Sequence, residues 1–445
     1  MCVVCFTVVG TIAVGAQLAP MPAAEIPQTP ERSFSSSQFP VNEAASLYSN
    51  NGKPFTSVRN LLSSKISDPV DQCRIQEASQ NKINYGPNNF TQAGFPVSRL
   101  TPNSGVVKWA LIPIDFADLP GEKKFRPRVN NQMKLLSEWY SSVSGGRLTI
   151  EWVVMDKWVT VPGKSKDYEI PRSVNLGDSE NGKKLFRNAM NAADPMFDFT
   201  NIQTVNFLLP KGQRIVLESS QGFPWDPEVK AYSSKEGPIS SYSIPGVFFD
   251  DPKRTYWSYW AHEFGHAIAL PHIGLSRGTI PPFNPWDLMG GQDGPSRELS
   301  GWLRMLAGWM SDSQVYCKDA AAIQSQTINL TPLSSNKSGQ KLAIIRVSST
   351  KAIMIESRRE TKFSCKTQPG RNGVLVYLYD AKLGHGDNFL VPVTEPGRAL
   401  QYTNCNTAPH PDVLLRAGDR VTVEGMTIEV VKIAGKDTVR ISKRS

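Results

Sequence analysis

The chain has 445 residues, of which 40% are hydrophobic and 20% are charged, and its formal net charge is +9. This composition is typical of a soluble globular protein with room for at least two domains. The 49 lysines and arginines form no dense run, so we read the charge as a solvated basic surface and expect no nucleic-acid partner. We also expect a monomer with no membrane span in the mature chain.

The amino terminus reads MCVVCFTVVGTIAVGAQLAP, and residues 2–16 carry no charge. A short apolar run that ends in small residues such as Gly15 and Ala16 is typical of a secretory signal peptide. The basic residues that usually lead such a signal are absent, since the first one in the chain is Arg32. We predict a signal peptide over 1–24 and a secreted, extracellular protein. The alternative is a buried hydrophobic strand.

Residues 25–104 are rich in Ser, Pro, Asn and Gln, which favours a pro-segment or linker with little regular structure. If this segment inhibits the rest of the chain, the protein is a zymogen, and we expect cleavage before Val106.

Outside the predicted signal peptide the chain has four cysteines, an even number that indicates two disulfides in an exported protein. Three pairings are open, and we favour Cys365–Cys405 together with Cys73–Cys317. The alternative for Cys73 is a free thiolate that caps a catalytic metal from the pro-segment. We disfavour it because the residues around Cys73 match no known switch motif.

Strand-like and helix-like segments alternate along the first half of the chain. The apolar run that begins at Val106 is rich in β-formers, and the next amphipathic segment is stopped by Gly145 and Gly146. We predict strands at 106–118, 147–161 and 204–210, and helices at 130–146, 179–194 and 256–270.

The sequence YWAHEFGHAIALPHIG, at 259–274, holds three of the chain's five histidines. His262 and His266 are four positions apart, so a helix places both imidazoles on one face. Two such imidazoles can bind one Zn²⁺ at about 2.0–2.1 Å, which is the H-E-x-x-H arrangement of zinc peptidases. Glu263 is one position off that face, where its carboxylate can take a proton from a water that the ion activates.

His272 is the expected third ligand, six residues after His266. Because Pro271 does not fit inside a regular helix, we expect the chain to leave the helix near Leu270 and to turn His272 back toward the metal. The site would then hold one catalytic zinc with three histidine ligands and one open position. The alternative is a set of core histidines on a buried helix.

Met289 follows His272 by seventeen residues, in the Gly-rich sequence WDLMGG. A thioether packed beneath imidazoles fills space without competing strongly for zinc. We therefore predict that Met289 is the methionine of a Met-turn, the hydrophobic floor of the site. On its own, a methionine in a loop would be read as core filler.

The motifs AHEFGHAIALPH, PWDLMGG and SGWLRMLAGWM together resemble the immune inhibitor A-type secreted metallopeptidases of the metzincin clan. The upstream sequences ALIPIDFADLPG and EWYSSVSGGRLTIEW are similar to that family's first strand, first helix and following strand, so the resemblance covers roughly 105–312. It implies a zinc endopeptidase that works outside the cell. It also implies that His262, His266 and His272 bind zinc and that Glu263 is the catalytic base.

Two positions depart from the wider metzincin pattern. Metzincins have Gly three residues after the second histidine, where this chain has Ala269. If that residue has a positive φ, alanine costs on the order of 1 kcal/mol. Some metzincins also place a Tyr two residues after the Met-turn methionine, where this chain has Gly291. Another transition-state donor is then needed, and Tyr256 and Tyr259 are candidates.

From about 320 the sequence changes to short apolar segments separated by Gly, Asn and Asp turns. We predict an all-β, sandwich-like domain over 319–445. It follows a zincin/metzincin-like catalytic domain over 105–318, with a mixed sheet and an active-site helix, so the whole is α+β. The acidic residues at 379–388 fit no Ca²⁺-binding loop, and we expect a solvated turn there. His385 and His410 are expected at the surface.

The predicted function is a secreted zinc-dependent endopeptidase that acts on proteins or peptides. One alternative is a non-catalytic surface- or glycan-binding protein on a metallopeptidase scaffold. Glu263 argues against it, because a binding module has no need of a general base. The other alternative is a zinc hydrolase of cell-wall peptides, which the motif does not separate from an endopeptidase because the water activation is the same.

Overall fold

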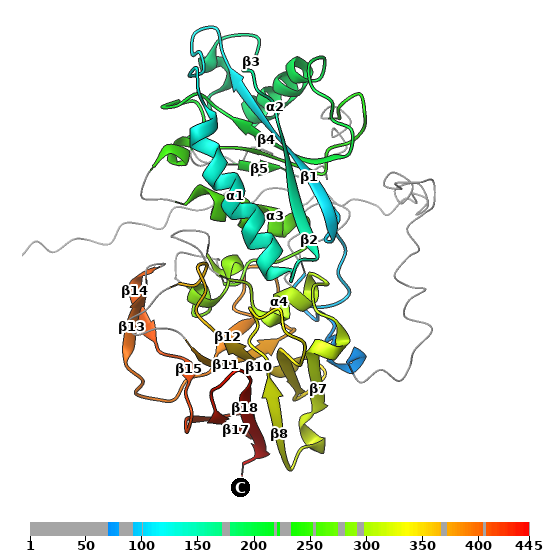
Figure 1. Cartoon of the computed structure of the whole chain (residues 1–445), viewed down its shortest axis with the longest axis vertical. Helices are drawn as coiled ribbons and strands as arrows, with labels where there is room; N and C mark the ends of the chain where they lie inside the picture. Colours follow the sequence, from blue (N-terminus) through cyan, green and yellow to red (C-terminus); the bar gives the residue numbers. More distant parts are fainter. Residues whose placement is uncertain are drawn as a thin grey trace, which may run out of the picture. The chain divides into compact units, whose positions relative to one another are not determined.

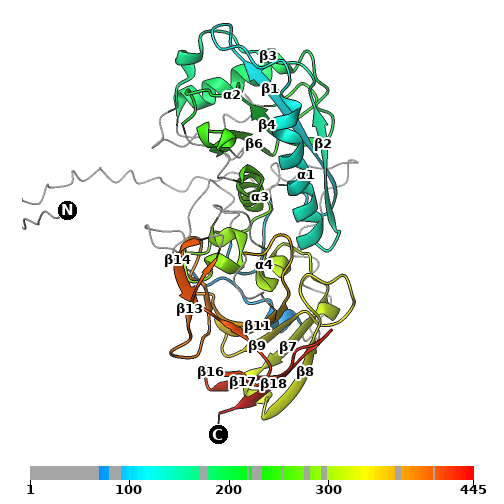
Figure 2. The same cartoon turned by 60° about the vertical axis from the view of Figure 1, so that its left-hand side comes forward.

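The structure is a computed structural model that describes residues 70–79, 92–99, 101–170, 179–217, 220–222, 233–251, 255–274, 281–291, 298–365, 372–403 and 406–444 (Figures 1 and 2). They belong to one unit, 67–445. The predicted signal peptide, 1–24, lies outside the described residues. Among the residues that are described, no helix combines the length and apolarity needed to cross a bilayer.

A mixed sheet forms the first half of the described chain. Its strands pair in the order β2-β1-β4-β6-β5, and β3 also pairs with β1. All of these pairs are parallel except β5 with β6, which is antiparallel. The strands are β1 (Gly105–Asp115), β2 (Leu148–Val154), β3 (Val159–Thr160), β4 (Ile202–Leu208), β5 (Ser220–Gly222) and β6 (Ser241–Ile244).

Helices cover both faces of this sheet (Figures 1 and 2). Because successive side chains of a strand point to opposite faces, one strand contributes to the cores on both sides. Trp109 and Leu111 of β1 pack into one core with α1 and α3, whereas Ala110 and Ile112 pack into another with α2. The helices are α1 (Arg126–Val143), α2 (Glu180–Ala193), α3 (Tyr256–Ala267) and the short α4 (Gly301–Leu306).

The sequence signals for these helices have clear counterparts in the structure. The first predicted helix, 130–146, begins earlier, at Arg126, and gives way to Gly145 and Gly146, both of which have positive φ. Ser179 caps α2 by accepting a hydrogen bond from the backbone N–H of Gly182.

Two larger sheets and one two-stranded sheet form the second half. The first has the order β12-β11-β10-β9-β7, with β15 also paired to β11, and the second has the order β16-β17-β18-β8. The strands of the first are β7 (Val315–Asp319), β9 (Leu342–Arg346), β10 (Lys351–Arg358), β11 (Gly373–Asp380), β12 (Leu390–Pro392) and β15 (Leu414–Leu415). Those of the second are β8 (Ser325–Leu330), β16 (Arg420–Val423), β17 (Met426–Lys432) and β18 (Asp437–Lys443), and β13 (Leu400–Thr403) pairs with β14 (Asn406–Pro411).

The sheet that contains β10 is buried on both faces. Ile345 and Ile353 pack against the four-stranded sheet, as in a sandwich. Their neighbours Ile344 and Met354 face the other way and join the core that also contains α3 and α4. The described elements after β7 are strands and one short 3-10 turn, and the two sheets share a core. The sheet nevertheless begins before the predicted domain boundary at 318, and its second face belongs to the core of the first half.

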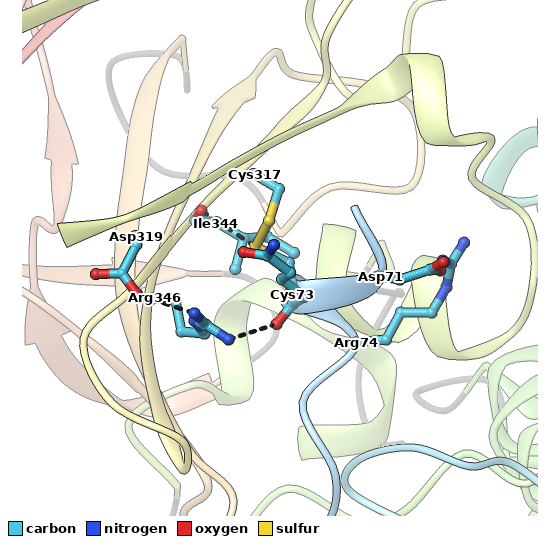
Figure 3. Close-up of a disulfide and its surroundings, with 8 residues drawn as sticks. Asp71, Cys73, Arg74, Cys317, Asp319, Ile344 and Arg346 are labelled. Atoms are coloured by element: carbon cyan, nitrogen blue, oxygen red, sulfur yellow. Dashed lines mark hydrogen bonds and ion pairs between the residues drawn. A yellow bond between two sulfur atoms is a disulfide. The ribbon is translucent and has the colours of Figure 1, made fainter. Parts of the chain in front are cut away.

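Part of the predicted pro-segment or linker is built into this structure (Figure 3). Its described residues have little regular structure beyond the 3-10 turn η3 (Asp71–Cys73). Cys73 is fully buried and forms a disulfide with Cys317 of β7, across a sequence separation of 244. Arg346 donates hydrogen bonds to the carbonyl of Gln72 and to the carboxylate of Asp319. The favoured Cys73–Cys317 pairing is therefore confirmed, and the free-thiolate alternative for Cys73 is wrong.

Only one cysteine of the second predicted disulfide lies within the described residues. Cys365 is buried and disulfide-bonded. Cys405, its predicted partner, lies outside the described residues, so the Cys365–Cys405 pairing stays a prediction.

We expect the Cys73→Ser, Cys317→Ser double variant to lose about 2–5 kcal/mol of unfolding free energy. The cross-link closes a very long loop, and without it the unfolded chain regains conformational freedom. Urea unfolding of the oxidised wild type and the double variant, side by side, measures the difference. An unchanged midpoint would mean that the disulfide contributes nothing to stability.

Candidate metal centre

Helix α3 carries the first two histidines and is held firmly in the core. The Trp260 indole N–H donates to the Ser243 hydroxyl at 3.1 Å, and the Phe264 ring lies edge-on to Trp109 with centroids 4.6 Å apart. Every residue of the helix except Glu263 is buried. A helix fixed in this way gives its side chains well-defined positions.

His262 and His266 lie on one face of α3, and each is oriented by a backbone carbonyl. His262 Nδ1 is 2.8 Å from the carbonyl oxygen of Leu288, and His266 Nδ1 is 2.8 Å from that of Leu270. A carbonyl oxygen only accepts hydrogen bonds, so both Nδ1 atoms carry the proton. The Nε2 atom of each neutral ring is then free to bind a metal.

The end of α3 brings the chain toward the third histidine. The helix ends at Ala267, earlier than the predicted 256–270. Its last turn closes with hydrogen bonds from the Ala269 N–H to the His266 carbonyl (2.9 Å) and from the Leu270 N–H to the Gly265 carbonyl (2.8 Å). This pattern is a Schellman motif, whose turning residue is left-handed. Ala269 has φ of +74°, which is the strained conformation expected if alanine replaces the metzincin glycine.

His272 completes a cluster of imidazoles. Its Nε2 lies 2.8 Å from His266 Nε2 and 2.9 Å from His262 Nε2. Burial lowers the pKa of His266 to about 4 and that of His272 well below its usual value, so both rings are neutral at pH 7. Unprotonated nitrogens that face one point repel each other unless a cation lies between them. The donor set therefore fits a metal ion.

Glu263 is the residue of α3 with access to the surface. Removal of most of the water around its carboxylate raises its pKa to about 8, and a hydrogen bond from the Tyr259 hydroxyl lowers it. A cation beside the carboxylate would also favour its charged form. The sequence made Tyr259 a candidate transition-state donor. In the structure its hydroxyl donates a hydrogen bond to Glu263 and so orients the carboxylate.

Met289 lies against the backbone of α3 at Gly265, which directly precedes His266. It is fully buried in the 3-10 turn η9 (Leu288–Gly290). A Cβ at Gly265 would lie 2.8 Å from the Met289 sulfur, so only glycine leaves room for the thioether at this distance. The Met289 carbonyl accepts a hydrogen bond from the N–H of Ile273, at 2.9 Å. The loop that holds Met289 therefore also contacts the segment of the third histidine.

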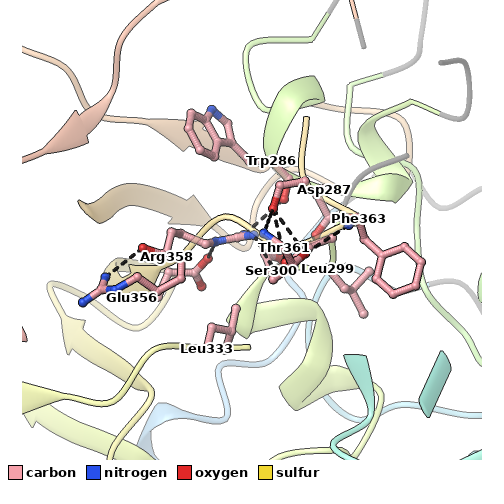
Figure 4. Close-up of polar contacts among 12 residues, drawn as sticks. Trp286, Asp287, Leu299, Ser300, Leu333, Glu356, Arg358, Thr361 and Phe363 are labelled. Carbon is pink, nitrogen blue, oxygen red and sulfur yellow. Dashed lines mark hydrogen bonds and ion pairs between the residues drawn. The ribbon is translucent and has the colours of Figure 1, made fainter. Parts of the chain in front are cut away.

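Buried polar groups hold the methionine loop in place (Figure 4). The Asp287 carboxylate accepts hydrogen bonds from the N–H groups of Met289 (2.8 Å) and Ser300 (2.7 Å). Arg358 of β10 donates to the carbonyl of Trp286 at 3.1 Å. Burial raises the pKa of Asp287 to about 6. Strand β10 of the second half thus helps to fix the loop that holds Met289.

The expectation that His385 is a surface residue is wrong. His385 is only 7% exposed, and its ring centroid lies 4.7 Å from that of His272. This contact joins residues 113 positions apart, so no local sequence pattern could indicate it. His410 is half-buried rather than exposed. Among the described residues, the acidic side chains of 379–388 form no group that could hold a metal ion.

No protein-family model matches the chain, and no curated protein matches it. Similar solved structures include metalloproteinase-II from Bacteroides fragilis, with 17% identity over 49% of this chain and 58% of its own, at a TM-score of 0.28. They also include wild-type OgpA from Akkermansia muciniphila in two crystal forms. These have 10% and 11% identity over 79% and 78% of this chain and 98% and 95% of their own, at TM-scores of 0.26 and 0.27.

This chain spans less than two thirds of the Bacteroides protein. The resemblance to the immune inhibitor A-type metallopeptidases is one of sequence motifs.

The Gly265→Ala variant should lose up to about 2 kcal/mol of unfolding free energy, because the overlap of the new methyl group with the Met289 thioether, about 1–3 kcal/mol, outweighs the gain of about 1 kcal/mol that alanine has over glycine in a helix. Unfolding of Gly265→Ala, Met289→Ala and the double variant forms a cycle that measures the contact. We expect the double variant to lose less than the sum of the two single losses. Simple additivity would mean that the two positions are not in contact.

The Ala269→Gly variant should gain about 0.5–1 kcal/mol of unfolding free energy, because glycine adopts the left-handed conformation without strain. Ala261→Gly, at a regular position within α3, is the matched control and should lose about 1 kcal/mol. Both are measured by denaturant unfolding. Equal losses in the two variants would contradict the positive φ at residue 269.

Proposed function

We propose that this protein is a secreted zinc-dependent endopeptidase with a metzincin-like catalytic centre. The proposal rests on one observation: three imidazole nitrogens converge, and two of their histidines lie on the same helix as Glu263, the one residue of α3 that is not buried. His262, His266 and His272 would hold the ion, and Glu263 would be the general base. We propose zinc because three neutral imidazoles beside a carboxylate base are the donor set of hydrolytic zinc sites.

The bound ion supplies Lewis-acid chemistry: it makes a water more acidic and polarises the scissile carbonyl. The residues of the chain do the remainder. Glu263 accepts a proton from the attacking water and gives it to the leaving amine. The Tyr259 hydroxyl keeps the carboxylate in one orientation, and the carbonyls of Leu270 and Leu288 keep two imidazoles facing the ion.

Two further observations support parts of the proposal. A fully buried disulfide persists in oxidising compartments, which supports export from the cytoplasm. The carboxylate of Glu263 supports catalysis over simple binding, because a binding module has no need of a general base. We propose peptide bonds of proteins as the substrate.

The Glu263→Gln variant should keep about one zinc per chain and hydrolyse casein at least about 100-fold more slowly than the wild type. The amide has nearly the same shape as the carboxylate but cannot accept the proton. Zinc content is measured by elemental analysis of the same purified samples, and hydrolysis by release of soluble peptides.

Two more variants complete the experiment. His266→Ala should lose both zinc and activity, because one ligand is missing. Glu180→Gln, at an exposed position of α2, should keep both. Wild-type turnover in Glu263→Gln would overturn the assignment of the base. Zinc without hydrolysis in the wild type would favour a binding protein or a narrow cell-wall substrate, and absence of zinc would overturn the metal centre.

A further inference from the structure

The loop between β11 and β12 lies against the segment that carries the third histidine. The backbone N–H of His272 donates to His385 Nδ1 at 3.3 Å, and its carbonyl accepts from the N–H of Gly386 at 3.0 Å. Two residues further on, the N–H of Gly274 donates to the carbonyl of Asp387 at 2.8 Å. Both polar groups of the His272 backbone are therefore satisfied by a loop from the other half of the chain.

Ile273, which lies between His272 and Gly274, is held by the methionine loop instead of the loop 384–388. The N–H of Ile273 donates to the carbonyl of Met289, at 2.9 Å. The segment thus alternates along its length as a strand does, with His272 and Gly274 bonded to the loop 384–388 and Ile273 bonded to the methionine loop. Since α3 ends at Ala267, no helical hydrogen bond reaches His272, and these contacts fix its backbone.

The two segments approach each other closely. Gly274 has φ of +64°, and a Cβ at this position would overlap the side chain of Asn388. A side chain at residue 274 would therefore be strained by its backbone conformation and would also push the loop away. Glycine is the residue that allows this contact.

The loop is itself well held. The Asp387 carboxylate accepts a hydrogen bond from the N–H of Gly384 at 3.0 Å, which closes a tight turn. At its start, the carbonyl of Ala381 accepts from the N–H of Ala78 at 2.7 Å, in the segment that the Cys73 disulfide ties to β7. A loop that is fixed on both sides can position what it touches.

We propose that the loop 384–388 positions the third metal ligand and that His385 is its principal positioning residue. This inference rests on the proposed metal centre. His385 is not one of the three histidines whose ring nitrogens converge; it accepts a hydrogen bond from the His272 backbone and packs its ring beside the His272 ring. The first half of the chain thus supplies the ligands, and a loop of the second half keeps one of them, His272, in position. Groups behind a metal ligand typically contribute about 10- to 100-fold to metal affinity.

The test is the zinc affinity of the full chain in His385→Leu and His385→Asn, measured by competition with a chelator. Leucine fills the space but accepts no hydrogen bond, so the affinity should fall about 10- to 100-fold. Asparagine places an acceptor oxygen near the former Nδ1, so its affinity should return toward the wild-type value. The absorption spectrum of the Co²⁺-loaded proteins should change in the leucine variant alone, because it reports ligand number and geometry.

Val439→Ala is the matched control, because Val439 is fully buried between the two sheets of the second half and lies outside the loop. It should lower the melting temperature and leave zinc affinity unchanged. Gly274→Ala perturbs the same contact from the segment of His272 and should weaken zinc binding. This variant tests the proposal even if His385→Leu does not fold.

The outcomes separate the two proposals. Zinc affinity in His385→Leu equal to that of the wild type would overturn the positioning role, and so would an equal loss in Val439→Ala. A wild-type chain that binds no zinc would instead overturn the metal centre on which the inference rests.

Discussion

Three imidazole nitrogens, two of them from α3, converge on one point, with two of the separations at 2.8 and 2.9 Å. Neutral rings that turn lone pairs toward one point repel each other, so each must be held by groups outside the cluster. Much of the surrounding structure meets this requirement. The carbonyls of Leu270 and Leu288 orient two rings, the loop 384–388 fixes the backbone of the third, and the aromatic core keeps α3 in place.

The three histidines lie close together in the sequence, but groups that hold them in place come from distant parts of the chain. The two-faced sheet makes this arrangement stable, since one of its faces packs with α3 and α4 while the other packs with the four-stranded sheet. Arg358 reaches from β10 to the methionine loop, and His385 reaches from the β11–β12 connection to His272. The core that contains α3 and α4 therefore includes residues from both sides of the predicted boundary at 318.

The sequence predicted the parts of the site that local spacing determines. The four-residue interval between His262 and His266 requires only a helix, and Ala269 was identified as strained if its φ were positive, which it is. The role of His385 was not predictable, because its partner lies 113 positions away and no periodic pattern links them. The helix also ended earlier than Pro271 suggested, because a Schellman turn at Ala269 closes it first. Strand order and shared cores depend on long-range packing, which composition does not encode.

A peptidase of the kind proposed would be exposed to its own activity and to that of its neighbours, and the Cys73–Cys317 disulfide changes what a cut in the backbone would do. The bond encloses most of the first half of the chain, including α3 and Met289. A single scission anywhere inside that loop leaves two pieces that remain covalently joined. The two fragments of a cleaved molecule would thus stay together with all three histidines. The cut would be visible on a denaturing gel only after the disulfide is reduced. The cross-link gives the chain a tolerance to backbone cleavage that does not depend on how tightly it is folded.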